Sequence, residues 1–148
     1  MKKTVCTILF LIGCVPFAIG NAMNDWMMAH ADMKPNFILV SLVFLLTVMA
    51  VTFFANILIK NTKYVVVSLM AVPAVVLVLI GVQELVLHQY WSNTVGAATQ
   101  LFYLPLLNLG FSLTPWAHIV FPAYLASFAL MVFASWLGCK LQSYWNKK

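Results

Sequence analysis

Residues 37–59 read FILVSLVFLLTVMAVTFFANILI, an apolar stretch without a charged side chain, and Lys60 follows it directly. A helix needs about 20 mostly apolar residues to cross roughly 30 Å of hydrocarbon. Because backbone hydrogen bonds must be satisfied internally in lipid, this stretch predicts a transmembrane helix. The whole chain of 148 residues has the same character, with 64% hydrophobic and only 7% charged residues. A soluble domain of this size could not bury so much apolar surface.

Three further apolar segments are candidates for membrane spans. They cover residues 4–20, 64–87 and 115–141. The last two contain Pro73 and Pro122, which lipid-embedded helices tolerate where neighbouring groups satisfy the freed carbonyl. We therefore predict an all-α, four-transmembrane-helix bundle that forms one membrane domain over residues 1–148.

The charged residues predict the orientation of this bundle. Seven lysines fall on one side of a four-span topology: Lys2, Lys3, Lys60, Lys63, Lys140, Lys147 and Lys148. The other side receives Lys34 and every acidic residue: Asp25, Asp32 and Glu84. By the positive-inside rule both termini are cytoplasmic, and the tryptophans at the span ends fit interfacial belts. The short basic start and the short loops favour a bacterial inner membrane.

The first apolar segment has three interpretations. It is an uncut membrane anchor, which we favour, or a signal peptide cleaved after Gly20, or a lipoprotein signal. The last interpretation depends on the sequence Leu11-Ile12-Gly13-Cys14, which resembles a bacterial lipobox with Cys14 as the lipidated residue. In either cleaved case three spans remain.

Residues 89–114 form a long outer segment without any charge. Its apolar centre, Leu101–Leu113, is too short to span a bilayer and has the length of a re-entrant or interfacial segment. Pro105 and Gly110 are expected to break a straight helix there. We favour an interfacial position over a re-entrant one.

The middle of each predicted span contains no ionisable side chain. Ion-coupled carriers usually place a carboxylate or a broken helix near the midplane, so an independent secondary transporter is disfavoured. An intramembrane hydrolase is also unsupported, since Ser127 lies about two helical turns from His118.

The outer side gathers the residues that could bind a metal. These are His30, Glu84, His88 and His118. Glu84 and His88 are spaced i, i+4, so we expect them on one helix face with side chains that can meet, and His118 could approach them if the third and fourth spans are neighbours. Methionines from Met23 to Met33 accompany His30, and thioether with imidazole suits copper(I), whereas imidazole with carboxylate suits zinc. Two histidines could also ligate haem. The competing interpretation is that polar residues gather at an interface because hydrocarbon excludes them.

The fourth span carries a stripe of small residues. Its members are Ala123, Ser127, Ala134 and Gly138. Small residues on one helix face permit close helix approach in membranes. We expect this stripe to pack within the bundle, with a dimer or a partner subunit as the alternative.

No pattern in the sequence indicates a catalytic site. The lysines are scattered and nucleic acid is not an expected partner. The three cysteines, Cys6, Cys14 and Cys139, form no CxxC pair. We expect a non-enzymatic protein that acts in the bilayer through helix–helix contacts, as an accessory subunit, an immunity-type protein or a regulator, with a membrane-protein partner or as a homo-oligomer. The alternatives are a metal- or haem-handling protein with a site at the outer face and, with less support, a pore- or lipid-handling protein.

Overall fold

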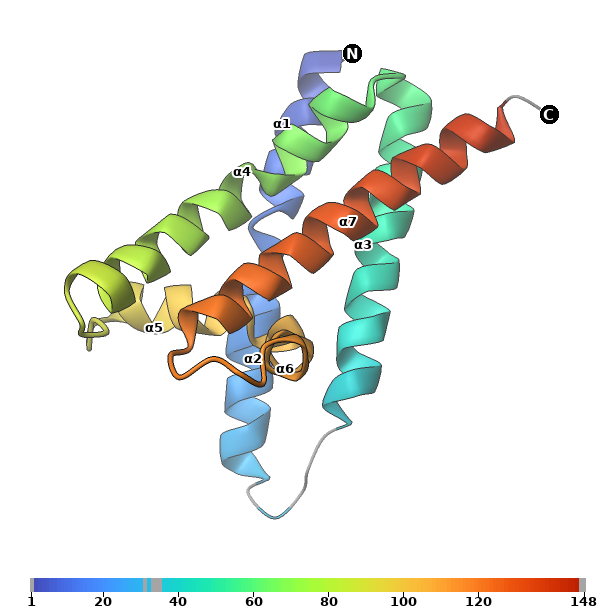
Figure 1. Ribbon diagram of the computed structural model, residues 1–148. Coiled ribbons are helices and arrows are strands. Elements are labelled where there is room, and N and C mark those ends of the chain that lie inside the picture. Colours follow the sequence, from blue (N-terminus) through green and yellow to red (C-terminus); the bar gives the residue numbers. More distant parts are fainter. Residues whose placement is uncertain (1, 31, 33–35, 147–148) are drawn as a thin grey trace.

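The computed structural model describes residues 2–30, 32 and 36–146, which are helical throughout apart from short turns. The helices are α1 (Lys2–Ile12), α2 (Val15–Ala29), α3 (Phe37–Ile59), α4 (Thr62–Gly81), the π-helical turn η1 (Val82–Val86), α5 (Thr94–Phe102), α6 (Leu104–Leu113) and α7 (Phe121–Trp145) (Figure 1). Met33, Lys34, Lys147 and Lys148, which the sequence analysis used, lie outside the described residues.

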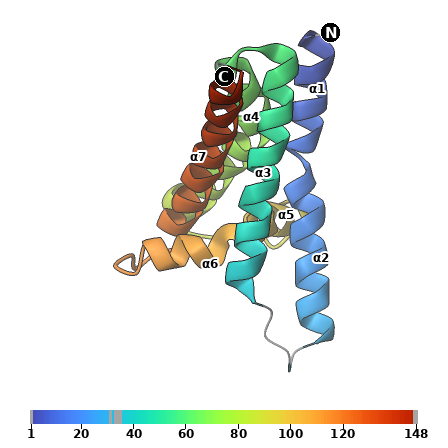
Figure 2. The ribbon, with the colours of Figure 1, turned by 90° about the vertical axis from the view of Figure 1, so that its right-hand side faces the viewer.

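The predicted number of helices that are long and apolar enough to span a membrane is confirmed. Among the described residues four helical segments are long and apolar enough to cross a membrane: Lys2–Ala29, Phe37–Ile59, Thr62–Val86 and Phe121–Trp145. The start of α1, the α3–α4 turn and the end of α7 lie at one end of the bundle (Figures 1 and 2). We call it the lysine end, after Lys2, Lys3, Lys60, Lys63 and Lys140. The opposite end, with His30, His88 and His118, is the histidine end.

The contact between α3 and α7 is the most extensive of any helix pair. Gly138 allows it, because a Cβ at this position would collide with the Met49 carbonyl and with Thr52 Oγ1. Close by, Asn56 Nδ2 donates a hydrogen bond of 2.7 Å to Gln142 Oε1, and both side chains are buried. A small residue and a buried amide pair therefore fix the register of these two spans.

The first span is longer than predicted and is interrupted. It covers 28 residues, Lys2–Ala29, with a break between α1 and α2 at Gly13. Pro73 in α4 has no N–H to bond the carbonyl of Leu69 four residues earlier. Gly13 lies against this carbonyl, and an added Cβ would stand 2.7 Å from the Leu69 oxygen. The first span thus approaches α4 where a proline weakens the α4 backbone.

A second glycine of the first span contacts a backbone carbonyl of α5. Helix α5 ends before Pro105, and its Leu101 carbonyl accepts a hydrogen bond from the Tyr103 N–H. Gly20 packs directly on that carbonyl, and an added Cβ would collide with it. Beside this contact, the rings of Phe17 and Phe102 meet edge to face with their centroids 4.7 Å apart.

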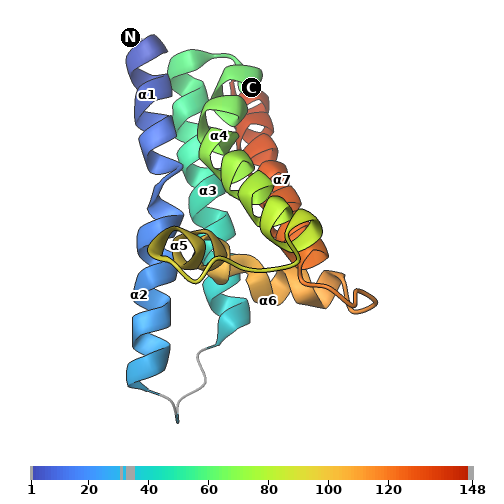
Figure 3. The same ribbon diagram turned by 90° about the vertical axis from the view of Figure 1, so that its left-hand side faces the viewer.

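Helices α5 and α6 run across the bundle rather than along it, and α2 and α3 extend beyond them at the histidine end (Figures 2 and 3). Helix α5 packs on α2 and α4, whereas α6 packs on α3 and α7. Tyr103, at the bend between them, donates a hydrogen bond of 2.6 Å to the carbonyl of Pro73. Ser41 in α3 donates one of 2.6 Å to the carbonyl of Pro105. We call α5 and α6 the transverse layer.

Two expectations about helix breaks are wrong. Gly110 lies inside α6, where its missing side chain makes room for Ala123 and Ser127 of α7. The fourth span begins at Phe121 rather than at residue 115, and Pro122 stands in its first turn instead of kinking its interior. Proline suits that position because the first N–H groups of a helix have no partner within the helix.

Replacing Gly138 with leucine should destabilise the protein itself, by about 1–3 kcal/mol, because the new side chain forces α7 away from the α3 backbone. Ala129→Leu is the matched control, since Ala129 lies on the exposed face of the same helix. The measurement is unfolding in detergent followed by circular dichroism. Equal stability of the two variants would contradict the close α3–α7 packing.

Candidate functional site

The four residues predicted to bind a metal do not form a cluster. Among the described residues no group of three His, Cys, Asp or Glu side chains is placed to hold a metal ion. His30 stacks on Trp26 with ring centroids 5.0 Å apart, and its Nδ1 lies 3.0 Å from the Trp26 carbonyl oxygen. His88 and His118 are exposed in the segments that follow η1 and precede α7. A metal or haem site at this end remains a prediction from the sequence that this arrangement does not support.

Glu84 and His88 do not share a helix face, so that expectation is wrong. The third span ends in a π-helical turn at Val86. His88 lies beyond it with a φ of 50°, which is the left-handed region. His88 therefore lies outside the helical turn that carries Glu84, so the i, i+4 geometry of an α-helix does not apply to the pair.

Glu84 instead joins the end of the third span to the beginning of the fourth. Its Oε1 accepts hydrogen bonds from the backbone N–H groups of Val120, at 2.6 Å, and Phe121, at 3.0 Å. Its Oε2 accepts a hydrogen bond from the hydroxyl of Tyr90. Burial and this hydrogen bond raise the pKa of Tyr90 above its ordinary value. A carboxylate at a helix N-terminus accepts hydrogen bonds from unpaired N–H groups, and its negative charge interacts favourably with the positive end of the helix dipole.

The neighbouring residue, Gln83, holds the transverse layer. Its side chain is fully buried, and its Nε2 donates a hydrogen bond of 3.1 Å to Thr99 Oγ1 in α5. Its Oε1 accepts one of 3.0 Å from the backbone N–H of Trp91. The polar pair at the end of the third span therefore positions both α5 and α7.

The small-residue stripe of the fourth span lies inside the bundle. Its four members, Ala123, Ser127, Ala134 and Gly138, are all buried. The half nearer the histidine end faces α6, where Ser127 Oγ donates a hydrogen bond of 3.3 Å to the Leu106 carbonyl. The half nearer the lysine end faces α3 through Gly138. The stripe is therefore covered by this chain's own helices.

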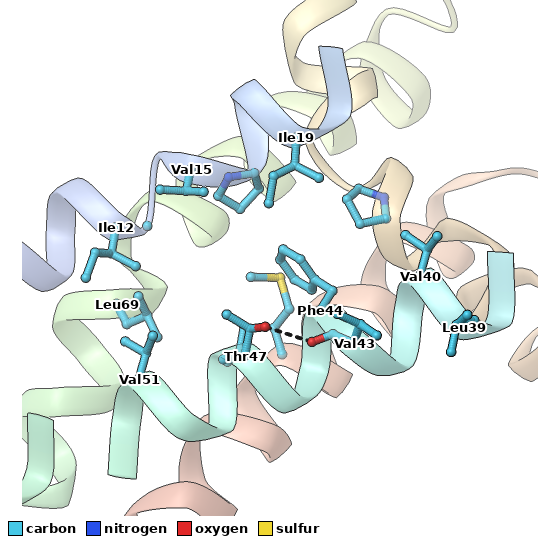
Figure 4. Close-up of a pocket in the computed structure, with 15 residues that line it drawn as sticks. Ile12, Val15, Ile19, Leu39, Val40, Val43, Phe44, Thr47, Val51 and Leu69 are labelled. Atoms are coloured by element: carbon cyan, nitrogen blue, oxygen red, sulfur yellow. Dashed lines mark hydrogen bonds between the residues drawn. The ribbon is translucent and has the colours of Figure 1, made fainter. Parts of the chain in front are cut away.

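A different feature, an apolar groove, lies between the first span and α3 (Figure 4). We call it the first-span groove. Its volume is about 380 Å³, within the range of small-molecule sites. Ile12, Val15 and Ile19 line one wall, and residues spaced along one face of α3 from Leu39 to Val51 line the other. The groove exists because the first span packs mainly on α4 and α5, whose carbonyls its glycines contact, and less extensively on α3.

The groove is deep and open to one side. Its floor contains Leu69, Pro105 and Met131, which come from three different helices and are buried. Its rim contains Leu39 and Val43, which are 57% and 55% exposed. The rim therefore faces the surroundings of the bundle, which for these helices are lipid, while the floor lies in the core.

The lining of the groove offers hardly any polar group. Thr47 carries the one hydroxyl among the lining side chains, and its Oγ1 donates a hydrogen bond of 2.8 Å to the Val43 carbonyl of its own helix. A ligand with a polar group at this depth would lose hydrogen bonds without replacement. The groove suits a hydrocarbon chain.

Sequence reasoning missed this groove for a physical reason. The polar residues Ser41 and Asn56 of α3 face α6 and α7. The groove-lining face from Leu39 to Val51 is apolar apart from Thr47, so no pattern distinguishes it from the lipid-facing side. Comparison with protein-family models, with curated proteins and with solved structures found no match for this chain.

Replacing Glu84 with glutamine should lower the stability of the fold by about 1–2 kcal/mol, because the α7 N-terminus loses its negative cap. Asp25→Asn at the same end is the control for lost charge, since no described hydrogen bond uses the Asp25 carboxylate. Thermal unfolding in detergent measures both variants. A Glu84→Gln variant as stable as Asp25→Asn would contradict the capping role.

Proposed function

We propose that this protein acts without catalysis, by binding an apolar hydrocarbon chain in the first-span groove. The supporting observation is the groove itself, an apolar cavity with a buried floor and a lipid-facing rim. This takes up the lipid-handling alternative from the sequence analysis. The ligand class is an acyl or isoprenoid chain that enters sideways from the bilayer.

The energetic basis of such binding is packing rather than water exclusion. Lipid tails are as apolar as leucine, so transfer from bilayer to groove gains nothing from the hydrophobic effect. A fixed concave wall gives the bound chain more close contacts than fluid neighbours do, and each contact adds about 0.1–0.2 kcal/mol. Rigidity of the groove is therefore what binding requires.

The transverse layer supplies that rigidity. Pro105 forms part of the floor, and its carbonyl accepts the hydrogen bond from Ser41 of the opposite wall. Gly20, which follows the lining residue Ile19 in α2, packs on Leu101 of the same layer. We infer that the layer is re-entrant, since Phe102, Tyr103 and Leu106 are each only 1% exposed inside the bundle. It would hold the two walls apart at a fixed width.

Action through helix–helix contacts, the expectation from the sequence, would need another surface. The small-residue stripe that motivated it contacts α3 and α6 of this chain. An accessory or regulatory role is compatible with the groove. In that case the bound hydrocarbon chain would belong to a substrate of the partner protein or to a lipid beside it. Metal handling has no comparable support, because its four residues lie apart.

Filling the groove should abolish binding of a hydrocarbon probe. Val43→Trp places an indole at the rim, whereas Leu46→Trp places one on an equally exposed position of α3 that does not line the groove. The probe is a spin-labelled stearic acid added to the protein in nanodiscs. Electron paramagnetic resonance measures the fraction of the probe whose motion is restricted by the protein. In Val43→Trp this fraction should correspond to about tenfold weaker binding of the probe, a loss of about 1.4 kcal/mol of binding free energy.

The Leu46→Trp variant should bind like the unmodified chain. If both tryptophan variants restrict the probe equally, the restricted lipid is general boundary lipid and the proposal fails.

We further propose that the lysine end faces the cytoplasm of a bacterial inner membrane, because lysine-rich loops are retained inside. A green fluorescent protein fused to the C-terminus should then fluoresce, and an alkaline phosphatase fused there should be inactive. Fusions in the α2–α3 segment should give the opposite result. An active C-terminal phosphatase would contradict this orientation.

A further inference from the structure

A second groove lies between α4 and α7, near the lysine end, and shares no lining residue with the first-span groove. We call it the lysine groove. Its volume is about 870 Å³. Its walls are apolar, with Val66 and Val67 from α4 and Phe128 and Val132 from α7. At the lysine end it is lined by Lys63, Lys140 and Trp136.

The two lysines carry positive charge that the protein does not neutralise. Both side chains are exposed, and no ion pair to either of them occurs among the described residues. The chain has three acidic residues, and all belong to the histidine end. Glu84 follows Lys63 by 21 positions on the third span. This corresponds to roughly 30 Å along a helix. The lysine groove is therefore positively charged at one end without compensation.

Trp136 marks the level at which polar and apolar surroundings meet. The Nζ of Lys140 lies 5.6 Å from the centroid of the Trp136 ring. Tryptophan and lysine gather at the headgroup level of membranes, where an amphipathic ring and a flexible cation find suitable partners. The Trp136–Lys140 pair thus fixes the depth of the groove's polar end.

The groove has the length of one leaflet. Along α7 it extends from Leu125 to Lys140. This corresponds to about 22 Å of helix. One leaflet contributes about 15 Å of hydrocarbon, and the remaining length reaches the headgroup region. A single lipid molecule fits this combination of apolar length and terminal charge.

We propose that the lysine groove binds an anionic glycerophospholipid. Lys63 and Lys140 receive the phosphate, and one acyl chain lies along Val67 and Phe128 toward Leu125. Basic pockets between transmembrane helices are suited to anionic headgroups. A zwitterionic lipid fits less well, because its cationic headgroup would approach two lysines with no acidic side chain nearby.

The test compares lipid retention by native mass spectrometry of the full chain, released from nanodiscs that contain equal amounts of phosphatidylglycerol and phosphatidylcholine. The unmodified protein should retain phosphatidylglycerol preferentially. Lys63→Gln with Lys140→Gln should weaken this retention by about 25-fold, at about fivefold for each lysine. Lys60→Gln is the matched control, since Lys60 belongs to the same α3–α4 turn and does not line the groove.

Lys63→Arg with Lys140→Arg should retain phosphatidylglycerol, because the charge is kept. Unfolding by circular dichroism verifies that all variants are folded. Equal retention of the two lipids by the unmodified protein would overturn the proposal. Unchanged retention of phosphatidylglycerol by the Lys63→Gln, Lys140→Gln variant would also overturn it. The two lysines would then serve only to orient the protein in the membrane. Equal loss in Lys60→Gln would assign the preference to net charge rather than to the groove.

Discussion

A backbone carbonyl or N–H in lipid needs a partner inside the protein, and the tertiary structure depends on where this chain leaves such groups free. Pro73 frees the Leu69 carbonyl, and Gly13 of the first span lies against it. Gly20 packs in the same way on the Leu101 carbonyl at the end of α5. The start of α7 leaves N–H groups free, and Glu84 accepts their hydrogen bonds. Each interruption of a helix is thus a point of contact between two elements.

This pattern explains why the bundle has grooves at all. The first span packs mainly on α4 and α5 and less extensively on α3, so an apolar space opens between it and α3. Helices α3 and α7 are held together by Gly138 and the buried amides of Asn56 and Gln142. The lysine groove lies between α4 and α7, lined at one end by Lys63 and Lys140. Both grooves follow from which helices approach most closely.

The membrane spans could be predicted from the sequence, because each depends on the average hydrophobicity of about 20 consecutive residues. The stretch from Phe37 to Ile59 was predicted to the residue, because asparagine and lysine bound an uninterrupted apolar run. Features that depend on local backbone geometry were not predictable. The π-helical turn displaced His88 from Glu84, and proline in a first turn moved the start of the fourth span to Phe121. The first-span groove was not predicted because its lining face of α3 is as apolar as the lipid-facing side.

The pairing of glycine with a proline-freed carbonyl has an evolutionary consequence. Gly13 and Pro73 depend on one another, because a side chain at Gly13 is excluded while the Leu69 carbonyl stays where Pro73 leaves it. Loss of Pro73 in a descendant sequence would restore the local helix and relax selection on Gly13. The two positions should therefore be inherited together, and substitutions at one should accompany substitutions at the other.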